Sequence, residues 1–278
     1  MDGRDQLPPL RDVIARFDLG AKKSLGQHFL LDQNLTDKIA RAAGNKAGNL
    51  SEFNIIEVGP GPGGLTRSLL AHDPKHLFAV ERDRRCIEAL EGLSQVFAEK
   101  FTIVSADAMK TDIASLGEKP RRIVANLPYN ISTALLINWL RQIEHIDQMT
   151  LMFQKEVVDR LIAKPSTKAY GRLSVITQWL CETKFEFNVD KRAFTPPPKI
   201  QSSVLTLRPR TKPLYAAKFE DMEKVTATAF GQRRKMLRSS LKPLDIDIST
   251  LGIDPTARAE NLTIEEFCLL AKAIEGRD

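Results

Sequence analysis

Short apolar runs alternate with amphipathic segments along most of the chain. Seven runs have the aliphatic and β-branched character of buried strands, and they are Asn54–Val58, Leu77–Val80, Phe101–Val104, Arg122–Ala125, Met149–Phe153, Phe185–Val189 and Ser203–Leu207. Amphipathic segments separate the early runs, at Leu65–Ala71, Asp83–Gly92 and Thr133–Arg141. Strand–helix alternation of this kind predicts βαβ units, so we expect an α/β fold with a mainly parallel sheet covered on both faces.

The pattern changes toward the C-terminus. No amphipathic helix separates the last two strand candidates, so we expect an antiparallel edge strand there, with Thr195–Pro198 as loop because proline cannot serve a central strand. After Pro209 three helical patterns follow, at Phe219–Phe230, Arg234–Leu241 and Thr263–Ile274. The sequence therefore predicts a large α/β domain over residues 1–210 and a small all-helical domain over residues 211–278.

Composition narrows the class of protein. The chain has 278 residues and is 42% hydrophobic, which is enough for a buried core. No apolar run approaches the roughly 18 residues of a membrane span, and the first twenty residues contain four aspartates and no apolar block, unlike a signal or transit peptide. The cysteines Cys86, Cys181 and Cys268 are isolated, which argues against a disulfide framework and a CxxC metal site. We expect a cytoplasmic protein with no metal and no membrane partner.

The charge is unevenly distributed. The whole chain carries a net charge of +6, which by itself indicates no partner. The segment from Lys191 to Lys242, however, contains thirteen basic and three acidic residues, a net charge of +10, so the rest of the chain carries −4. Such a local excess is typical of a polyanion-binding surface, although a solvated basic surface gives the same pattern.

A glycine-rich loop follows the first strand. Residues Glu57–Gly64 contain four glycines and open a helix, and glycine allows a tight turn and a close approach to a ligand. Glu81 ends the second strand, where a carboxylate can accept hydrogen bonds from both hydroxyls of a ribose. Asp107 follows the third strand, where its side chain can accept from an adenine amino group. No GxxxxGK[ST] motif occurs, which excludes a P-loop, and a dinucleotide or another adenosine-containing ligand remains open.

The fourth strand is followed by Asn126-Leu127-Pro128-Tyr129. The Asn126 side-chain oxygen and the carbonyl of Leu127 or Pro128 can each accept an N–H bond from an exocyclic adenine amine. These bonds direct the nitrogen lone pair at an electrophile. Tyr129 can stack on the base, a contact worth about 1–3 kcal/mol. The alternative is a strand end in which Asn126 caps the next helix and Pro128 breaks the strand.

Taken together, these motifs resemble those of Rossmann-like methyltransferases that use S-adenosylmethionine and methylate adenine at the exocyclic nitrogen. Further segments narrow the resemblance, namely Lys22–Leu30, Phe153–Val157, Tyr170–Ser174 and Phe194–Val204. Nearly end to end, the chain is similar to the family of small-subunit ribosomal RNA adenine dimethyltransferases. One departure is His28, where the family more often has Asn; we expect the cofactor contact to survive, because His also forms hydrogen bonds.

The resemblance implies a role for each matching position. It implies a Rossmann-like methyltransferase sheet with a small helical C-terminal domain, and an N-terminal segment, residues 1–50, that covers the cofactor and contacts RNA. The cofactor-binding residues would be Gln27, His28, Leu30, Gly59, Gly61, Glu81, Asp107 and Asn126. The catalytic residues would be Asn126, Leu127, Pro128, Tyr129 and Phe194, with Tyr129 and Phe194 holding a flipped adenine. The RNA contacts would be Lys22, Lys23, Lys199, Arg233, Arg234, Lys235 and Arg238.

The implied reaction is dimethylation of two adjacent adenosines in a small-subunit rRNA hairpin, with S-adenosyl-L-homocysteine as product. The partner would be small-subunit rRNA or a pre-small-subunit particle, bound by a monomer. One alternative within the resemblance is a large-subunit rRNA adenine methyltransferase that confers antibiotic resistance. The sequence motif Asn126–Asn130 and the C-terminal segment Phe230–Lys235 favour the small-subunit enzyme. Another alternative is a non-catalytic assembly or transcription factor with the same fold, against which the intact glycine loop and acidic residues argue.

Overall fold

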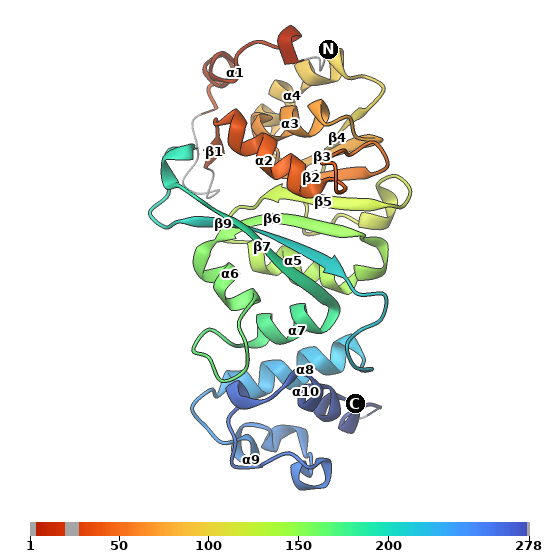
Figure 1. The fold of residues 1–278 in the computed structure, drawn as a ribbon, viewed down its shortest axis with the longest axis vertical. Helices are drawn as coiled ribbons and strands as arrows, with labels where there is room; N and C mark the ends of the chain where they lie inside the picture. Colours follow the sequence, from red (N-terminus) through yellow and green to blue (C-terminus); the bar gives the residue numbers. More distant parts are fainter. Residues whose placement is uncertain (1–3, 20–27, 277–278) are drawn as a thin grey trace. The chain divides into compact units, whose positions relative to one another are not determined.

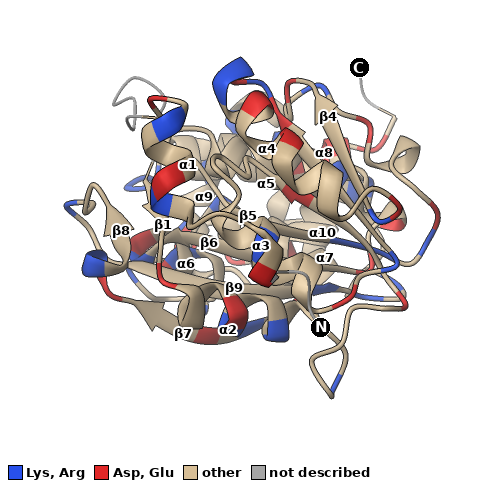
Figure 2. Ribbon diagram, turned by 90° about the horizontal axis from the view of Figure 1, so that it is seen from above, with Lys and Arg blue, Asp and Glu red and all other residues tan. Residues whose placement is uncertain are grey.

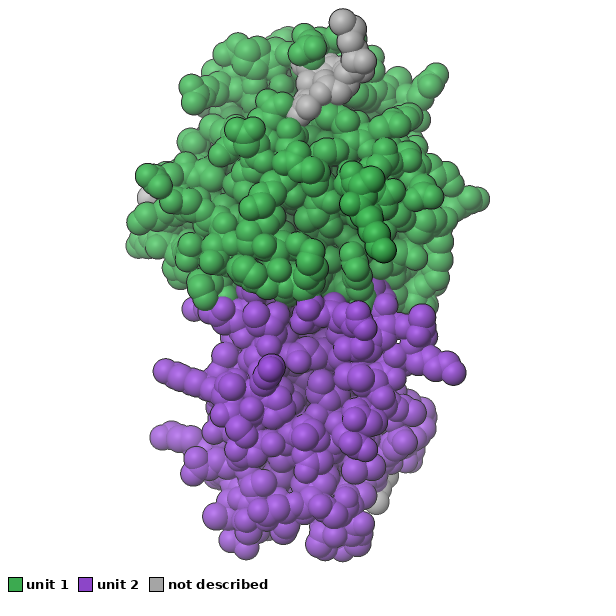
Figure 3. All heavy atoms as spheres, viewed as in Figure 1, with its two compact units in different colours: residues 1–155, 184–208 green, residues 156–183, 209–278 purple. Residues whose placement is uncertain are grey.

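The computed structural model describes residues 4–19 and 28–276 of the chain (Figure 1). The chain falls into two compact units (Figure 3). The first unit comprises Met1–Lys155 and Lys184–Arg208, and the second comprises Glu156–Thr183 and Pro209–Asp278. Residues 156–183 thus cluster with the C-terminal helices, although their sequence lies between two strands of the sheet. The assignment of separate functions to two domains stays a prediction.

A seven-stranded sheet forms the centre of the first unit. Its spatial order is β4-β3-β2-β5-β6-β9-β7. The strands are β2 (Asn54–Val58), β3 (His76–Glu81), β4 (Phe101–Ser105), β5 (Arg121–Asn126), β6 (Gln148–Gln154), β7 (Cys181–Val189) and β9 (Ser202–Pro209). The first five are parallel to one another, and β9 is antiparallel to β6. The predicted mainly parallel sheet with antiparallel pairing at one end is confirmed.

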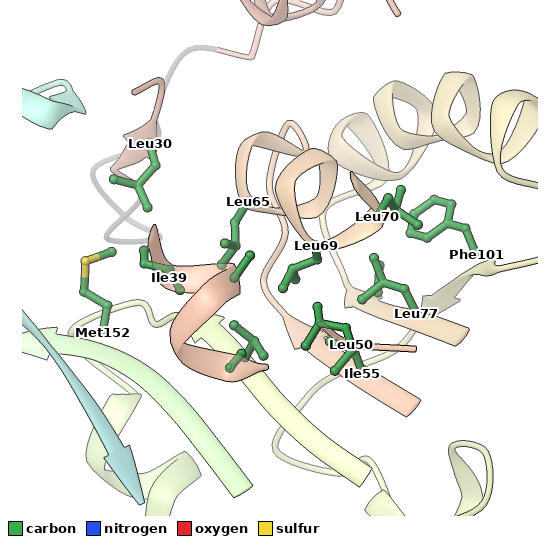
Figure 4. Packing of buried hydrophobic residues seen from close by; sticks show 14 of the residues in the cluster. Leu30, Ile39, Leu50, Ile55, Leu65, Leu69, Leu70, Leu77, Phe101 and Met152 are labelled. Atoms are coloured by element: carbon green, nitrogen blue, oxygen red, sulfur yellow. The ribbon is translucent and has the colours of Figure 1, made fainter. Parts of the chain in front are cut away.

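Helices of the first unit bury their apolar faces against this sheet. They are α2 (Gln33–Ala43), α3 (Gly64–Ala71), α4 (Arg84–Val96) and α5 (Ser132–Arg141). Helix α1 (Leu10–Arg16) also belongs to this unit, and its Val13 packs in a smaller cluster with Phe29, Cys86 and Ala89. Ile39 of α2 and Leu65 and Leu69 of α3 belong to one buried cluster with Ile55 of β2 and Leu77 of β3 (Figure 4). Because this cluster fixes α3 on the sheet, it also fixes the glycine loop at which α3 begins.

A second sheet of two short strands lies beside the glycine loop. β1 (Phe29–Leu30) pairs antiparallel with β8 (Phe194–Thr195), so that Leu30 lies opposite Phe194 and Phe29 opposite Thr195. The predicted loop at Thr195–Pro198 therefore begins one residue later, because Thr195 is the last residue of β8. This pairing brings the chain around residue 28 next to the chain around residue 196, and no sequence pattern predicted it.

The second unit is helical. Its helices are α6 (Lys155–Leu161, of which the first residue belongs to the first unit), α7 (Arg172–Leu180), α8 (Phe219–Gly231), α9 (Leu237–Ser240) and α10 (Ile264–Ala273). Phe230 of α8 stacks on Phe267 of α10 at 5.5 Å between ring centroids, and the edge of Tyr170 contacts Phe230. Arg172 of α7 forms an ion pair with Glu223 of α8. The predicted helix over Arg234–Leu241 is shorter than expected, since residues 232–236 form an exposed turn.

Single-turn 3₁₀ helices occur at Arg4–Gln6, Ile113–Ser115, Ile143–His145, Lys191–Ala193, Lys242–Leu244, Ile248–Leu251 and Ala259–Asn261. Within the described part of the chain, every helix is too short or too polar to cross a membrane.

Candidate functional site

A cavity of about 380 Å³ opens at the carboxyl ends of four parallel strands of the first unit. Its lining comes from the ends of β2, β3, β4 and β5 and from the segment that begins at His28. Its volume lies in the range of small-molecule sites, and the ends of parallel strands are where open α/β sheets bind ligands. The cavity thus brings together most of the residues that the sequence singled out.

The glycine loop forms one wall of the cavity. Gly59, Gly61 and Gly63 have φ angles of +69°, +56° and +90°, a conformation that residues with side chains rarely adopt. Close packing adds a second requirement at Gly64, where a Cβ atom would lie 2.4 Å from the carbonyl oxygen of Leu30. The loop therefore needs glycine both for its turns and for the close approach of β1, which covers it.

Glu81 holds the glycine loop from the end of β3. Its Oε2 accepts a hydrogen bond of 3.2 Å from the backbone N–H of Gly61. Its Oε1 accepts from the N–H groups of Arg82 and Asp83, at 2.8 and 2.9 Å. The carboxylate is only 8% exposed and is fixed by three backbone donors. It lies in the cavity wall, and its role in binding a ribose stays a prediction.

Glu57 is a second acidic residue in the wall, and the sequence analysis did not assign it a role. It lies on β2, is 1% exposed, and its Oε2 has no hydrogen-bond partner among the described residues. Burial raises the pKa of Glu57 to about 8; the Thr66 hydroxyl opposes this shift, and the charge of Glu81 adds to it. A charged residue within an otherwise apolar strand, two positions before a glycine loop, was the signal that could have identified it.

Asp107 follows β4 and lines the same cavity. Its Oδ1 accepts a 3.0 Å hydrogen bond from the N–H of Met109, and its backbone carbonyl accepts from Lys110 and Thr111. These bonds close a tight turn, which fixes the carboxylate beside the cavity. The side chain is half-buried and keeps acceptor capacity for a ligand.

The segment after β5 crosses the cavity. The side-chain amide of Asn126 donates a 3.1 Å hydrogen bond to the backbone carbonyl of His28, and Asn126, Leu127, Pro128 and Tyr129 all line the cavity. Asn126 does not cap the next helix, because α5 begins at Ser132, six residues later. The Tyr129 hydroxyl lies 2.7 Å from Ser202 Oγ, and burial raises the pKa of Tyr129, which keeps the phenol neutral.

Two of the predicted site residues, His28 and Phe194, differ in whether they line the cavity. His28 lines the cavity, and its imidazole Nδ1 is 2.8 Å from the carbonyl oxygen of Pro196. Phe194 is 2% exposed, packs in the core cluster of the first unit and is not among the residues that line the cavity. In this structure Phe194 supports the wall from behind, and its role against a flipped adenine stays a prediction.

The predicted RNA contacts that the structure describes lie in both units. Lysine and arginine residues are spread over many elements in Figure 2, with acidic residues among them. Lys199 in the first unit and Arg234, Lys235 and Arg238 in the second are exposed. Arg233, by contrast, forms an ion pair with Glu260 and donates to the backbone carbonyl of Lys168. Gln27, Lys22 and Lys23 lie outside the described residues.

Leu30, Gly59 and Gly61 line the cavity, and their role in binding a cofactor stays a prediction. No cluster of three or more His, Cys, Asp or Glu side chains suited to a metal ion occurs among residues 4–19 and 28–276.

Comparison with known proteins gives consistent matches. The family model for "Ribosomal RNA adenine dimethylase" matches residues 19–275. The chain is 58% identical over 275 residues to ribosomal RNA small subunit methyltransferase A of Paramagnetospirillum magneticum, covering 98% of this chain and 96% of that protein. It is 54% identical over 275 residues to the protein of the same name from Rhodospirillum rubrum, covering 98% and 94%.

Solved structures show the same fold. A dimethyladenosine transferase from Plasmodium falciparum matches with a TM-score of 0.73 and 24% identity, covering 87% of this chain and 96% of that one. The 23S rRNA methyltransferase ErmE matches with a TM-score of 0.64 and 26% identity, covering 89% and 99%.

Proposed function

The chain belongs to the ribosomal RNA adenine dimethylase family, and we propose that it dimethylates adenosines of small-subunit ribosomal RNA, with S-adenosylmethionine as methyl donor. The observation that carries the proposal is the position of Asn126. Its side-chain amide is fixed by the His28 carbonyl, and it lines a cavity that the glycine loop and two buried acidic residues, Glu57 and Glu81, also line. One cavity therefore offers both a nucleoside-type site and an amide that can read an adenine amine.

The residues present fit the cofactor. When bound, S-adenosylmethionine supplies an electrophilic methyl group on a sulfonium ion, a reaction in which the protein contributes mainly positioning. Glu81 would accept from the ribose hydroxyls and Asp107 from the adenine amine. The orphaned Oε2 of Glu57 lies in the same wall and gives a cationic ligand an acceptor that protein groups leave unused. His28 to Leu30 would cover the cofactor from the side of β1.

The target adenine would be held by the segment after β5. The Asn126 amide oxygen and the carbonyl of Leu127 or Pro128 would accept from the exocyclic amine and orient its lone pair, and Tyr129 would stack on the base. The amine is unreachable inside a stacked helix, so the nucleotide must be flipped out. No strong general base is needed, since the amine proton becomes acidic once the nitrogen is alkylated.

Curated relatives at 58% and 54% identity over nearly the whole chain bear the small-subunit name, whereas the 23S enzyme is 26% identical. This favours the small subunit over large-subunit methylation. The intact site favours catalysis over a purely structural role. We further propose that two adjacent adenosines of one hairpin are modified, that the particle bound is a pre-small-subunit in the cytoplasm, and that the protein acts as a monomer.

The test is to incubate the protein with labelled S-adenosylmethionine and small subunits from a strain that lacks this modification, and then to map the modified nucleotides. The proposal expects label on two neighbouring adenosines, with two methyl groups each at completion. Large subunits serve as the control substrate. Label on large subunits alone would support the alternative, and cofactor binding without any transfer would support the non-catalytic one.

A further inference from the structure

Three aromatic rings meet beside the cavity of the first unit. The His28 imidazole lies 5.5 Å from the Tyr129 ring, centroid to centroid, with the two planes inclined by 31°. It lies 6.4 Å from the Phe194 ring, which it meets edge to face at 80°. Both separations are within the range of favourable aromatic pairs. His28 and Tyr129 line the cavity, as does Phe29, whereas Phe194 does not, so of the three rings that meet here the imidazole and the phenol are the two available to a ligand.

The imidazole is held in this place by the chain that follows Phe194. Its Nδ1 lies 2.8 Å from the carbonyl oxygen of Pro196, and because a carbonyl only accepts, Nδ1 carries the proton. The pairing of β1 with β8 brings the two segments together, with Leu30 opposite Phe194. The ring thus connects the segment expected to cover the cofactor with the loop expected to hold the base.

The backbone and the side chain of His28 have separate contacts. The backbone carbonyl accepts the hydrogen bond from Asn126, and any residue at position 28 can supply that carbonyl. The side chain contacts Tyr129, Phe194 and Pro196, which all belong to the region assigned to the target base. The contacts that the structure gives this side chain therefore differ from the cofactor contact expected from the sequence.

We propose that the His28 imidazole is part of the target-base pocket, where it extends the aromatic surface of Tyr129 and stacks against the flipped adenine. The inference rests on the proposed function and specifies one wall of its substrate site. His28 is then a substrate-contacting residue through its ring, while its backbone orients Asn126.

Two substitutions separate the ring from the hydrogen bond. His28→Asn removes the ring but keeps an amide donor that can reach the Pro196 carbonyl, whereas His28→Phe keeps an aromatic ring and removes the donor. His145→Asn is the matched control, because His145 lies in a 3₁₀ turn outside the cavity lining, with its Nε2 3.4 Å from the Glu144 carboxylate. Each variant is measured for kcat/KM on under-methylated small subunits at saturating cofactor, and for cofactor affinity by calorimetry without RNA.

Base–aromatic stacking predicts that His28→Asn lowers kcat/KM by about tenfold or more, while His28→Phe stays within about threefold of the wild type. Cofactor affinity should stay within about twofold in both. Wild-type activity in His28→Asn, or equal losses in both variants, would overturn the proposal. A loss of cofactor affinity in proportion to kcat/KM would also overturn it, by returning the side chain to the cofactor.

Wild-type transfer is measured first, so that a failure of the proposed function is seen separately. A hairpin RNA with 2-aminopurine in place of the target adenine gives an independent readout, since its fluorescence rises when the base leaves the stack and falls when it stacks on a protein ring. The rise on binding should therefore be small for the wild type and His28→Phe and larger for His28→Asn. If the fluorescence change is the same in both variants, the His28 ring is not part of the target-base pocket, and this conclusion holds even if the protein transfers no methyl group.

Discussion

The side-chain amide of Asn126 donates a hydrogen bond to the backbone carbonyl of His28, a residue 98 positions earlier in the chain. Because the carbonyl can only accept, the amide nitrogen must face it, and the amide oxygen is left for another donor. The bond joins the end of β5 to the residue before β1. The strand end that we propose reads the target amine is therefore oriented by the segment that covers the glycine loop.

Asn126→Ala should abolish most methyl transfer, because it removes the acceptor that orients the target amine. We expect a loss of about 100-fold or more in kcat, the size of effect that mispositioning of reacting groups produces. Binding of small subunits should change little, since phosphate contacts dominate affinity. Labelled-cofactor assays and filter binding measure the two quantities. Asn34→Ala on the exposed face of α2 is the control, and equal activity in both variants would contradict the role of Asn126.

Gly64→Ala should displace β1 from the glycine loop. Its Cβ would meet the carbonyl oxygen of Leu30 at 2.4 Å, and relief of such a clash typically costs about 1–3 kcal/mol. We expect a lower melting temperature and weaker cofactor binding by calorimetry. The contrasting variant is Gly92→Ala in α4, where a Cβ meets nothing within 4 Å and should stabilise the helix by up to about 1 kcal/mol. Equal effects of the two would show that β1 does not cover the loop tightly.

Local patterns were enough to predict much of this fold. Six of the seven strands were predicted within a residue or two of their observed bounds. Five of them are the parallel strands, which are buried on both faces and read as continuous apolar runs. The acidic residues at the ends of β3 and β4 were predicted to lie together, because parallel strands bring their carboxyl ends to one edge of the sheet. In a parallel sheet, residues that follow successive strands in the sequence therefore lie close together in the fold.

Other features depend on contacts that no local pattern encodes. The pairing of β1 with β8 involves two residues on each side, too few for periodicity to be seen. Residues 156–183 cluster with the C-terminal helices through long-range packing, such as the ion pair of Arg172 with Glu223. Phe194 is buried because it packs in the core cluster of the first unit. The sequence motif that contains Phe194 does not indicate this packing, so it could not predict whether the ring faces the cavity or the core.

Glu57 should make stability depend on pH. Burial raises its folded-state pKa from 4.5 to about 8, so between these values the unfolded chain loses the proton while the folded protein keeps it. The contribution of this group to stability is therefore full below about pH 4.5, falls as pH rises to about 8, and is level above.

The comparison with Glu57→Gln isolates this contribution. The difference in unfolding free energy should move in favour of the variant by up to about 1.4 kcal/mol per pH unit between pH 5 and 8. Urea unfolding at pH 5, 6.5 and 8 measures it. Parallel pH profiles of the two proteins would mean that Glu57 is ionised throughout.

The basic residues of the C-terminal unit should separate into two classes. Arg234 and Lys235 are exposed, and no side-chain hydrogen bond or ion pair of theirs is found in the described part of the chain, so their side chains are free to bind phosphate. Arg233 instead pairs with Glu260 at 2.8 Å and donates to the Lys168 carbonyl, which connects the turn after α8 to two other segments of the second unit. The first class should therefore serve RNA binding and the second the stability of the unit.

Charge reversal and truncation distinguish these two classes. Arg234→Glu with Lys235→Glu should weaken RNA binding and reduce its salt slope by roughly 0.7–0.9 for each phosphate that the protein no longer neutralises, with no change in melting temperature. Arg233→Ala should lower the melting temperature by a few degrees at most, because half-exposed ion pairs contribute only about 0–1 kcal/mol. Arg41→Glu with Lys46→Glu, two exposed cations of the first unit, controls for net charge. If that control lowers the salt slope equally, RNA binding depends on overall charge and not on this turn.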